Sequence, residues 1–271
     1  MLFRSREFWQ LGIELLGASG TYADAEVITI AVKTMREIGL DNFKVSLNQM
    51  GIFNSLLDDS GMNNQEKEII RNLVEKKDLV ELSRVLENMA IDDGLKETIA
   101  ILPVLHGGLE VLNRIPYVES NRNASQAVSD LLKVYEALQD WGVIDNIVVD
   151  MGVLRGLDYY TGIVFEGYSP DLGYGLLGGG RYDNLLGQFG FPCPATGFAL
   201  GIDRLALVLK HRDEEPRRFL VGGTDFKTVV QKAEELRSQG YIVEIDVKGS
   251  SREELEKRME NRENCSLIYA D

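Results

Sequence analysis

The sequence predicts an α+β protein: an antiparallel sheet flanked by helices, with a helical insertion and a small C-terminal α/β lobe. Short apolar or alternating segments separated by glycine clusters and short loops occur at both ends of residues 1–210, which favours antiparallel pairing. Between them, at about residues 62–141, apolar residues recur three and four apart, the spacing of amphipathic helices. Residues 217–271 then alternate strand and helix patterns.

The first elements follow from local patterns. Residues 8–14 alternate apolar and polar side chains before Gly17, which predicts a strand with Gln10 and Glu14 on one face. Thr21 offers an N-cap for a helix that ends near Gly39, and a short strand and a short helix are expected at residues 43–47 and 51–57.

Further along, the periodicity predicts several helices from residue 64, the last of them at 127–141 before Gly142. The core sheet resumes with strands at 144–154, 159–168, 174–177 and 195–201, followed by a helix at 203–210. A charged segment at 211–217 separates the core from the C-terminal lobe. In that lobe we expect strands at 219–221, 241–247 and 266–269 and helices at 227–239 and 251–261.

Composition excludes several functions. The formal net charge is −14, and residues 211–271 alone carry −3, so nucleic-acid binding is not expected. No apolar run approaches the roughly 20 residues of a membrane helix. The cysteines and histidines of the chain are Cys193, Cys265, His106 and His211, which are too few and too scattered for a zinc site. We therefore expect a cytoplasmic protein without metal or cofactor.

The densest chemical pattern is R-G-L-D-Y-Y-T-G-I-V-F-E at residues 155–166. Arg155 supplies a guanidinium fork for a carboxylate or phosphate, and Tyr159 and Tyr160 supply phenols that pack and form hydrogen bonds. This set suits a small zwitterion. The alternative is a surface pair of Arg155 and Asp158 beside two half-buried tyrosines.

Two weaker patterns follow. G-G-G-R-Y-D at residues 178–183 allows a ligand to approach the backbone, or marks a bulge or turn. G-F-A-L-G-I-D-R at residues 197–204 predicts a strand that enters a helix, with Arg204 in the first helical turn. Arg204 there faces an anionic group or pairs within its own helix.

Together with R-E-F-W-Q-L-G-I-E-L-L-G at residues 6–17, these patterns resemble the histidyl-tRNA synthetases and their catalytically silent relatives, the regulatory subunits of ATP phosphoribosyltransferase. The resemblance covers nearly the whole chain. Residues 6–17 resemble the end of class II synthetase motif 2, and residues 197–204 resemble motif 3. It implies a class II synthetase-like core at 1–210 that lacks motif 1, and a small α/β domain at 217–271.

The resemblance also implies roles for single residues. Gln10 would lie near the amino group of bound histidine, and Glu14 would face the imidazole. Arg155 would meet the carboxylate, Tyr159 would line the pocket, and Tyr160 would contact the imidazole. Arg204 matches an arginine that holds ATP phosphates in the synthetases. For Glu14, a solvated strand carboxylate is the alternative.

The acidic C-terminal lobe and the sequence around residues 165–174 favour the regulatory subunits. The resemblance then implies a non-catalytic protein of histidine biosynthesis, with L-histidine as effector. It also implies a homodimer within a hetero-oligomer with the catalytic subunit. An upstream segment is expected to complete the histidine pocket. The alternatives are a truncated histidyl-tRNA synthetase and a free-standing histidine-binding module.

Overall fold

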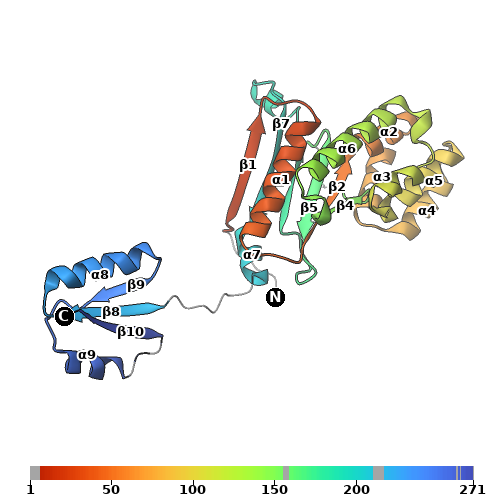
Figure 1. The fold of residues 1–271 in the computed structure, drawn as a ribbon. Helices are drawn as coiled ribbons and strands as arrows, with labels where there is room; N and C mark the ends of the chain where they lie inside the picture. Colours follow the sequence, from red (N-terminus) through yellow and green to blue (C-terminus); the bar gives the residue numbers. More distant parts are fainter. Residues whose placement is uncertain (1–6, 155–158, 210–216, 261, 263, 271) are drawn as a thin grey trace. The chain divides into compact units, whose positions relative to one another are not determined.

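The computed structural model describes residues 7–154, 159–209, 217–260, 262 and 264–270 (Figure 1). The chain divides into two compact units, Met1–Leu209 and Lys210–Asp271. The larger unit contains a seven-stranded sheet of order β1-β7-β6-β5-β2-β4-β3, in which β2 and β4 are parallel and the other neighbours are antiparallel. The predicted α+β class with a mainly antiparallel sheet is therefore confirmed.

The strands and α-helices of this unit have the following bounds along the chain. The strands are β1 (Gln10–Leu16), β2 (Lys44–Gln49), β3 (His106–Gly107), β4 (Ile147–Asp150), β5 (Ile163–Tyr168), β6 (Leu177–Arg181) and β7 (Ala195–Gly201). The α-helices are α1 (Thr21–Glu37), α2 (Met50–Asp59), α3 (Asn64–Glu75), α4 (Leu79–Glu87), α5 (Asp93–Ile101), α6 (Arg122–Asp140) and α7 (Ile202–Val208).

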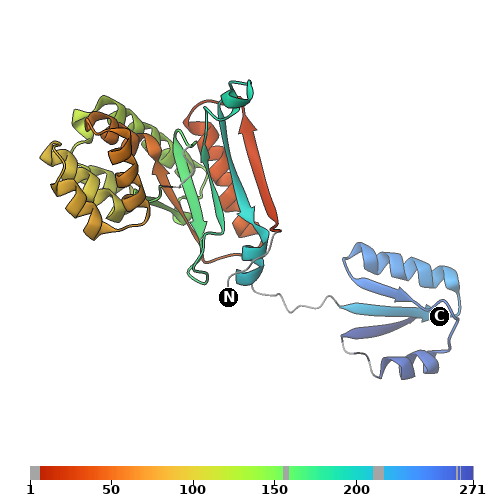
Figure 2. The same ribbon diagram turned by 180° about the vertical axis from the view of Figure 1, so that it is seen from behind.

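The two faces of the large sheet have different surroundings. Helices α1 and α6 lie across one face (Figure 1), where Leu47, Phe165 and Phe198 point into the main hydrophobic core. Burial of this apolar surface is the main source of stability for the unit. On the opposite face, turned toward the viewer in Figure 2, the alternation of the strands places Glu14 and Glu166. We call this second side the open face.

The structure decides one open alternative and corrects one expectation. Of the alternatives for the glycines at 178–180, the bulge or turn is excluded, because these residues form the interior of β6 and pair with β5 and β7 on both sides. Gly20, not Thr21, occupies the N-cap position of α1, and no side chain caps that helix end. Gly20 has φ of 109°, a backbone conformation that a residue with a side chain rarely adopts.

Helical structure dominates residues 64–140, as the periodicity predicts. Helix α3 begins with a capping box in which Asn63 and Glu66 satisfy each other's backbone N–H groups. Helices α3, α4 and α5 pack in sequence order, whereas α6 packs on α1 and α2 and reaches β2. The last helix of the run therefore covers the sheet together with α1. No described helix is long and apolar enough to cross a membrane.

The smaller unit is a three-stranded parallel sheet of order β10-β8-β9 with two helices. Its elements are β8 (Arg218–Gly223), α8 (Phe226–Ser238), β9 (Ile242–Ile245), α9 (Arg252–Met259) and β10 (Cys265–Ala270). The predicted order of strand and helix is confirmed. Its core contains Val221, Val229, Ala233, Leu236 and Val243.

Asp246 ties the loop after β9 to the start of α9. Its buried carboxylate accepts a hydrogen bond from the Ser250 backbone N–H at 2.7 Å, which together with further hydrogen bonds and Arg258 holds the pKa of Asp246 below its usual range. Asp246→Asn is expected to destabilise this unit by about 1 kcal/mol at neutral pH.

This difference should depend on pH. The pKa of Asp246 is lower in the folded state than in the unfolded state. Its ionised carboxylate therefore stabilises the folded unit fully above the unfolded pKa of about 3.9, and this stabilisation is lost as the pH falls through the folded pKa. Hydrogen exchange of the β8, β9 and β10 amides at neutral and acidic pH measures it. Equal exchange in the two proteins at neutral pH would contradict the prediction.

Candidate functional site

The edge strand β1 presents its polar side chains on the open face. In the antiparallel register with β7, Gln10 lies opposite Gly201 and Glu14 lies opposite Gly197. Both side chains are exposed and lie on the same face of the sheet, as the alternation predicts. A carboxylate and an amide are therefore available to a ligand above β1.

Glu14 is joined there by three tyrosines. The Tyr182 hydroxyl donates a hydrogen bond to Glu14 Oε2. The Tyr182 ring meets the Tyr159 ring edge to face at 5.8 Å between centroids, and Tyr159 lies 4.6 Å from the Tyr160 ring. Burial, and then the hydrogen bond to Glu14, raise the pKa of Tyr182, so its phenol remains protonated and donates at neutral pH.

Two glycines on neighbouring strands make room for this cluster. A Cβ at Gly197 would overlap the Glu14 carboxylate, and a Cβ at Gly180 would lie 2.8 Å from the Tyr160 ring. Gly180 and Gly197 are paired across β6 and β7. The glycines therefore form a flat floor on which the carboxylate and the aromatic rings lie.

Arg181 fixes the strand that carries Tyr182. Its guanidinium lies on the buried side of the sheet, with Nε 3.0 Å from each carboxylate oxygen of Asp24 and Nη1 2.9 Å from Asp183. Burial raises the pKa of Asp24, although the hydrogen bonds from Arg181 oppose that shift. Asp183 also accepts from the Ala195 backbone N–H at 3.1 Å. Arg181 thus acts in the core, while the next residue, Tyr182, reaches the open face.

The predicted site residues are only partly brought together. Glu14, Tyr159 and Tyr160 belong to one cluster, and Gln10 shares their face of the sheet. Arg204 instead donates a hydrogen bond to the Gly175 carbonyl.

Arg155 lies outside the described residues, as does Asp158. Tyr182 completes the cluster and was missing from the predicted set. Its only sequence signal was its place in G-G-G-R-Y-D, directly after the three glycines.

This cluster is suited to binding a small polar molecule. The Glu14 carboxylate accepts hydrogen bonds from N–H groups, and the tyrosine rings provide flat apolar surfaces. Within the described ranges, no group of three or more His, Cys, Asp or Glu residues could hold a metal ion. The arrangement favours recognition of a planar ligand with an N–H donor.

Comparisons with known proteins assign the chain to a family. The family model described as histidyl-tRNA synthetase matches residues 1–205. The regulatory subunit of ATP phosphoribosyltransferase from Moorella thermoacetica is 39% identical over 259 residues, which is 94% of this chain and 66% of that protein. The protein of the same name from Acetivibrio thermocellus is 34% identical over 252 residues, 91% of this chain and 60% of that protein.

A solved structure agrees. The ATP phosphoribosyltransferase regulatory subunit/histidyl-tRNA synthetase from Bacillus halodurans superimposes with a TM-score of 0.78 and 28% identity, covering 97% of this chain and 69% of that one. The chain spans slightly less than two thirds of the two curated relatives. The predicted class II synthetase-like fold is confirmed, and the chain belongs to the histidyl-tRNA synthetase family.

Proposed function

We propose that this protein is a regulatory, non-catalytic subunit of ATP phosphoribosyltransferase. It would assemble with a catalytic subunit in the cytoplasm, as a homodimer within a hetero-oligomer, and take part in the first step of histidine biosynthesis. The observation that carries the proposal is the sequence identity of 34–39% to two proteins named as such subunits, over more than nine tenths of the chain.

L-Histidine is the proposed effector, and the Glu14 cluster is its proposed site. Glu14 would accept the imidazole N–H, Gln10 would lie near the amino group, and Arg155 would meet the carboxylate. Tyr159 and Tyr160 would line the pocket. Regulation then follows from linkage: if histidine binds one arrangement of the complex more tightly, it shifts the population toward that arrangement and lowers turnover.

Reconstitution tests the proposal. The protein is mixed with a short-form catalytic subunit, and the formation of phosphoribosyl-ATP from ATP and phosphoribosyl pyrophosphate is followed with and without histidine. We expect co-elution of the two proteins in gel filtration and a histidine-sensitive rate. If the proteins elute separately and the rate is the same with and without this protein, the proposal is wrong.

A histidyl-tRNA synthetase activity is the alternative, and the family model and the motif-3-like arginine, Arg204, favour it. Its discriminating reaction is histidine-dependent exchange of pyrophosphate into ATP. We expect no exchange above background. The net charge of −3 in residues 211–271 is also unfavourable for holding a tRNA stem. Exchange above background would replace the regulatory proposal with the enzymatic one.

Tyr182→Phe tests whether the phenol positions Glu14 for the effector. The ring contact with Tyr159 should survive, but the hydrogen bond to Glu14 is lost. We expect histidine to bind about three- to tenfold more weakly, the effect of one net hydrogen bond. Isothermal titration calorimetry measures it, with Tyr22→Phe, an exposed tyrosine of α1, as the control. Unchanged affinity would show that Tyr182 has no positioning role.

A further inference from the structure

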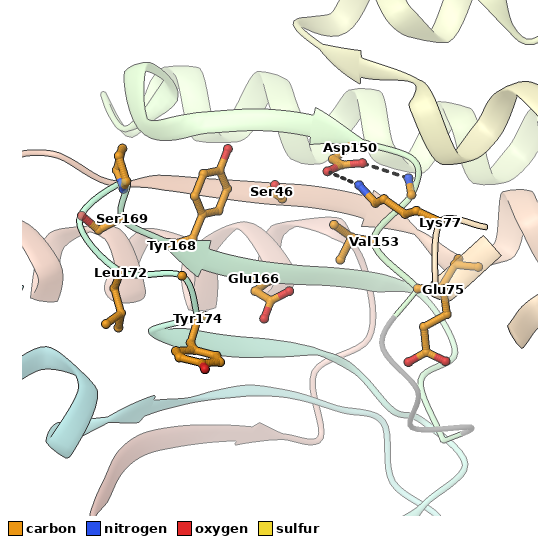
Figure 3. Close-up of a pocket in the computed structure, with 15 residues that line it drawn as sticks. Ser46, Glu75, Lys77, Asp150, Val153, Glu166, Tyr168, Ser169, Leu172 and Tyr174 are labelled. Atoms are coloured by element: carbon orange, nitrogen blue, oxygen red, sulfur yellow. Dashed lines mark hydrogen bonds and ion pairs between the residues drawn. The ribbon is translucent and has the colours of Figure 1, made fainter. Parts of the chain in front are cut away.

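A second pocket lies on the open face, away from the Glu14 cluster. Its volume is about 950 Å³, and none of Glu14, Tyr159, Tyr160 and Tyr182 lines it. Figure 3 shows it over strands β2 and β5, between the turn that joins α3 to α4 and the loop that joins β5 to β6. Of the proposed histidine-site residues that the structure describes, none lines this space.

The floor of the pocket is a polar pair on neighbouring strands. Ser46 on β2 and Glu166 on β5 are directly opposite in the antiparallel register, and both side chains line the pocket. Ser46 is only 4% exposed, and its hydroxyl has no hydrogen-bond partner among the described residues. Ser46 Oγ is not one of the buried atoms that lack a partner, so the hydroxyl opens onto the pocket and can donate to or accept from a ligand there.

The charge of the lining favours a cation. Glu75, Asp150 and Glu166 supply three carboxylates, whereas Lys77 is the single basic residue among the described lining residues. Lys77 Nζ lies 3.6 Å from Asp150 Oδ2, so this lysine is already opposed by a carboxylate. Glu166 has no such partner in the described structure. The described lining residues therefore carry a net charge of about −2 at neutral pH.

The rest of the lining fits an organic cation better than a bare metal ion. Tyr168 and Tyr174 lie at the mouth (Figure 3), and aromatic rings attract ammonium groups through their negative faces. Gly175 lies directly against Glu166, since a Cβ there would overlap the carboxylate oxygen. Arg204 donates to the carbonyl of this same Gly175, which places the guanidinium against the loop backbone.

The opposite wall is also well ordered. The Asn48 side chain donates to the carbonyls of Met151 and Val153 at 3.1 Å each, and Asp150 accepts from the Gly152 N–H at 2.9 Å. Asn48 itself is fully buried. The wall that carries Asp150 is therefore held in place by hydrogen bonds within the chain, as a preformed binding site requires.

From these observations we propose that the pocket binds a small organic ammonium ion. Its N–H groups would be accepted by the Glu166 carboxylate and the Ser46 hydroxyl, and its remaining charge would lie near Glu75 and Asp150. The proposal concerns a site separate from Glu14 and does not depend on the proposed role in histidine biosynthesis.

The probe is butane-1,4-diamine, titrated into the full chain by calorimetry at low salt, with butane-1,4-diol and succinate as neutral and anionic probes. We expect saturable binding of the diamine with one site per chain, and none of the other two. Glu166→Gln should weaken binding about tenfold or more, and Ser46→Ala by a smaller factor. Glu87→Gln, an exposed carboxylate of α4 outside the pocket, should have no effect.

Replacement of Lys77 should change the affinity for the diamine in one defined direction. Its φ of 53° suits asparagine, so Lys77→Asn removes the positive charge without straining the turn. A cation site should then bind the diamine more tightly, about two- to fivefold at an exposed position. Tryptophan fluorescence checks folding, since Trp9 and Trp141 both lie in the larger unit. The proposal is overturned if the diamine does not saturate, if all variants bind it equally, or if succinate binds and Lys77→Asn abolishes that binding.

Discussion

Glu14→Gln is expected to weaken histidine binding by roughly 1.5–3 kcal/mol, on the order of ten- to a hundredfold in Kd. The carboxylate accepts the Tyr182 phenol at Oε2, and no other described residue donates a hydrogen bond to its second oxygen, which is free to accept an imidazole N–H. Glutamine keeps the size of the side chain but replaces a charged acceptor with an amide, so one charge-assisted hydrogen bond is lost. The measurement is the inhibition of the reconstituted phosphoribosyltransferase by histidine.

The control for this experiment is Glu37→Gln, an exposed carboxylate at the end of α1. Association with the catalytic subunit should survive in both variants, while feedback inhibition is reduced only in Glu14→Gln. An unchanged inhibition curve would mean that Glu14 is a solvated strand carboxylate that does not bind histidine. The effector site would then lie elsewhere, for example on the catalytic subunit.

Arg181→Met is expected to destabilise the larger unit by about 3–5 kcal/mol, because it leaves the Asp24 carboxylate buried without its charged partner. Asp24 is 3% exposed and Arg181 is 7% exposed, and Arg181 also donates to the carbonyls of Ala18 and Gly20. Urea unfolding followed by tryptophan fluorescence reports on this unit, since it contains both tryptophans.

Two further variants separate the buried charge from lost packing. Arg84→Met breaks an exposed ion pair with Glu81 on α4 and should leave the unfolding midpoint almost unchanged. Adding Asp24→Asn to Arg181→Met removes the unpaired charge, so part of the lost stability should return. If Arg181→Met unfolds at the wild-type urea concentration, the pair of Arg181 and Asp24 does not stabilise the fold.

Much of the fold follows from local sequence. The alternation around Gln10 and Glu14 predicts a strand with both side chains on one face, and β1 has that arrangement. The strand predicted at residues 195–201 agrees with β7 at both ends. These predictions succeed because side-chain period and glycine or turn residues are properties of a few neighbouring residues.

Other features needed the whole chain. Three glycines in succession have low intrinsic strand propensity, so the local pattern left open both a close approach by a ligand and a bulge or turn at 178–180. They form β6 because flanking strands provide hydrogen bonds on both sides. The Tyr160 ring against Gly180 and the side chains of Phe165 and Phe198 against Gly179 leave no space for a Cβ at these two positions. The helical periodicity likewise identified α6 but not its packing against α1.

By itself, then, the sequence determined the α+β class, the common face of Gln10 and Glu14, and the motifs that identify the family. Only the tertiary structure decided that Tyr182 donates its hydrogen bond to Glu14, a residue 168 positions away. It also assigned the adjacent arginine, Arg181, to the core through Asp24. The physical reason is that strand pairing and burial depend on contacts between distant segments, which no local pattern specifies.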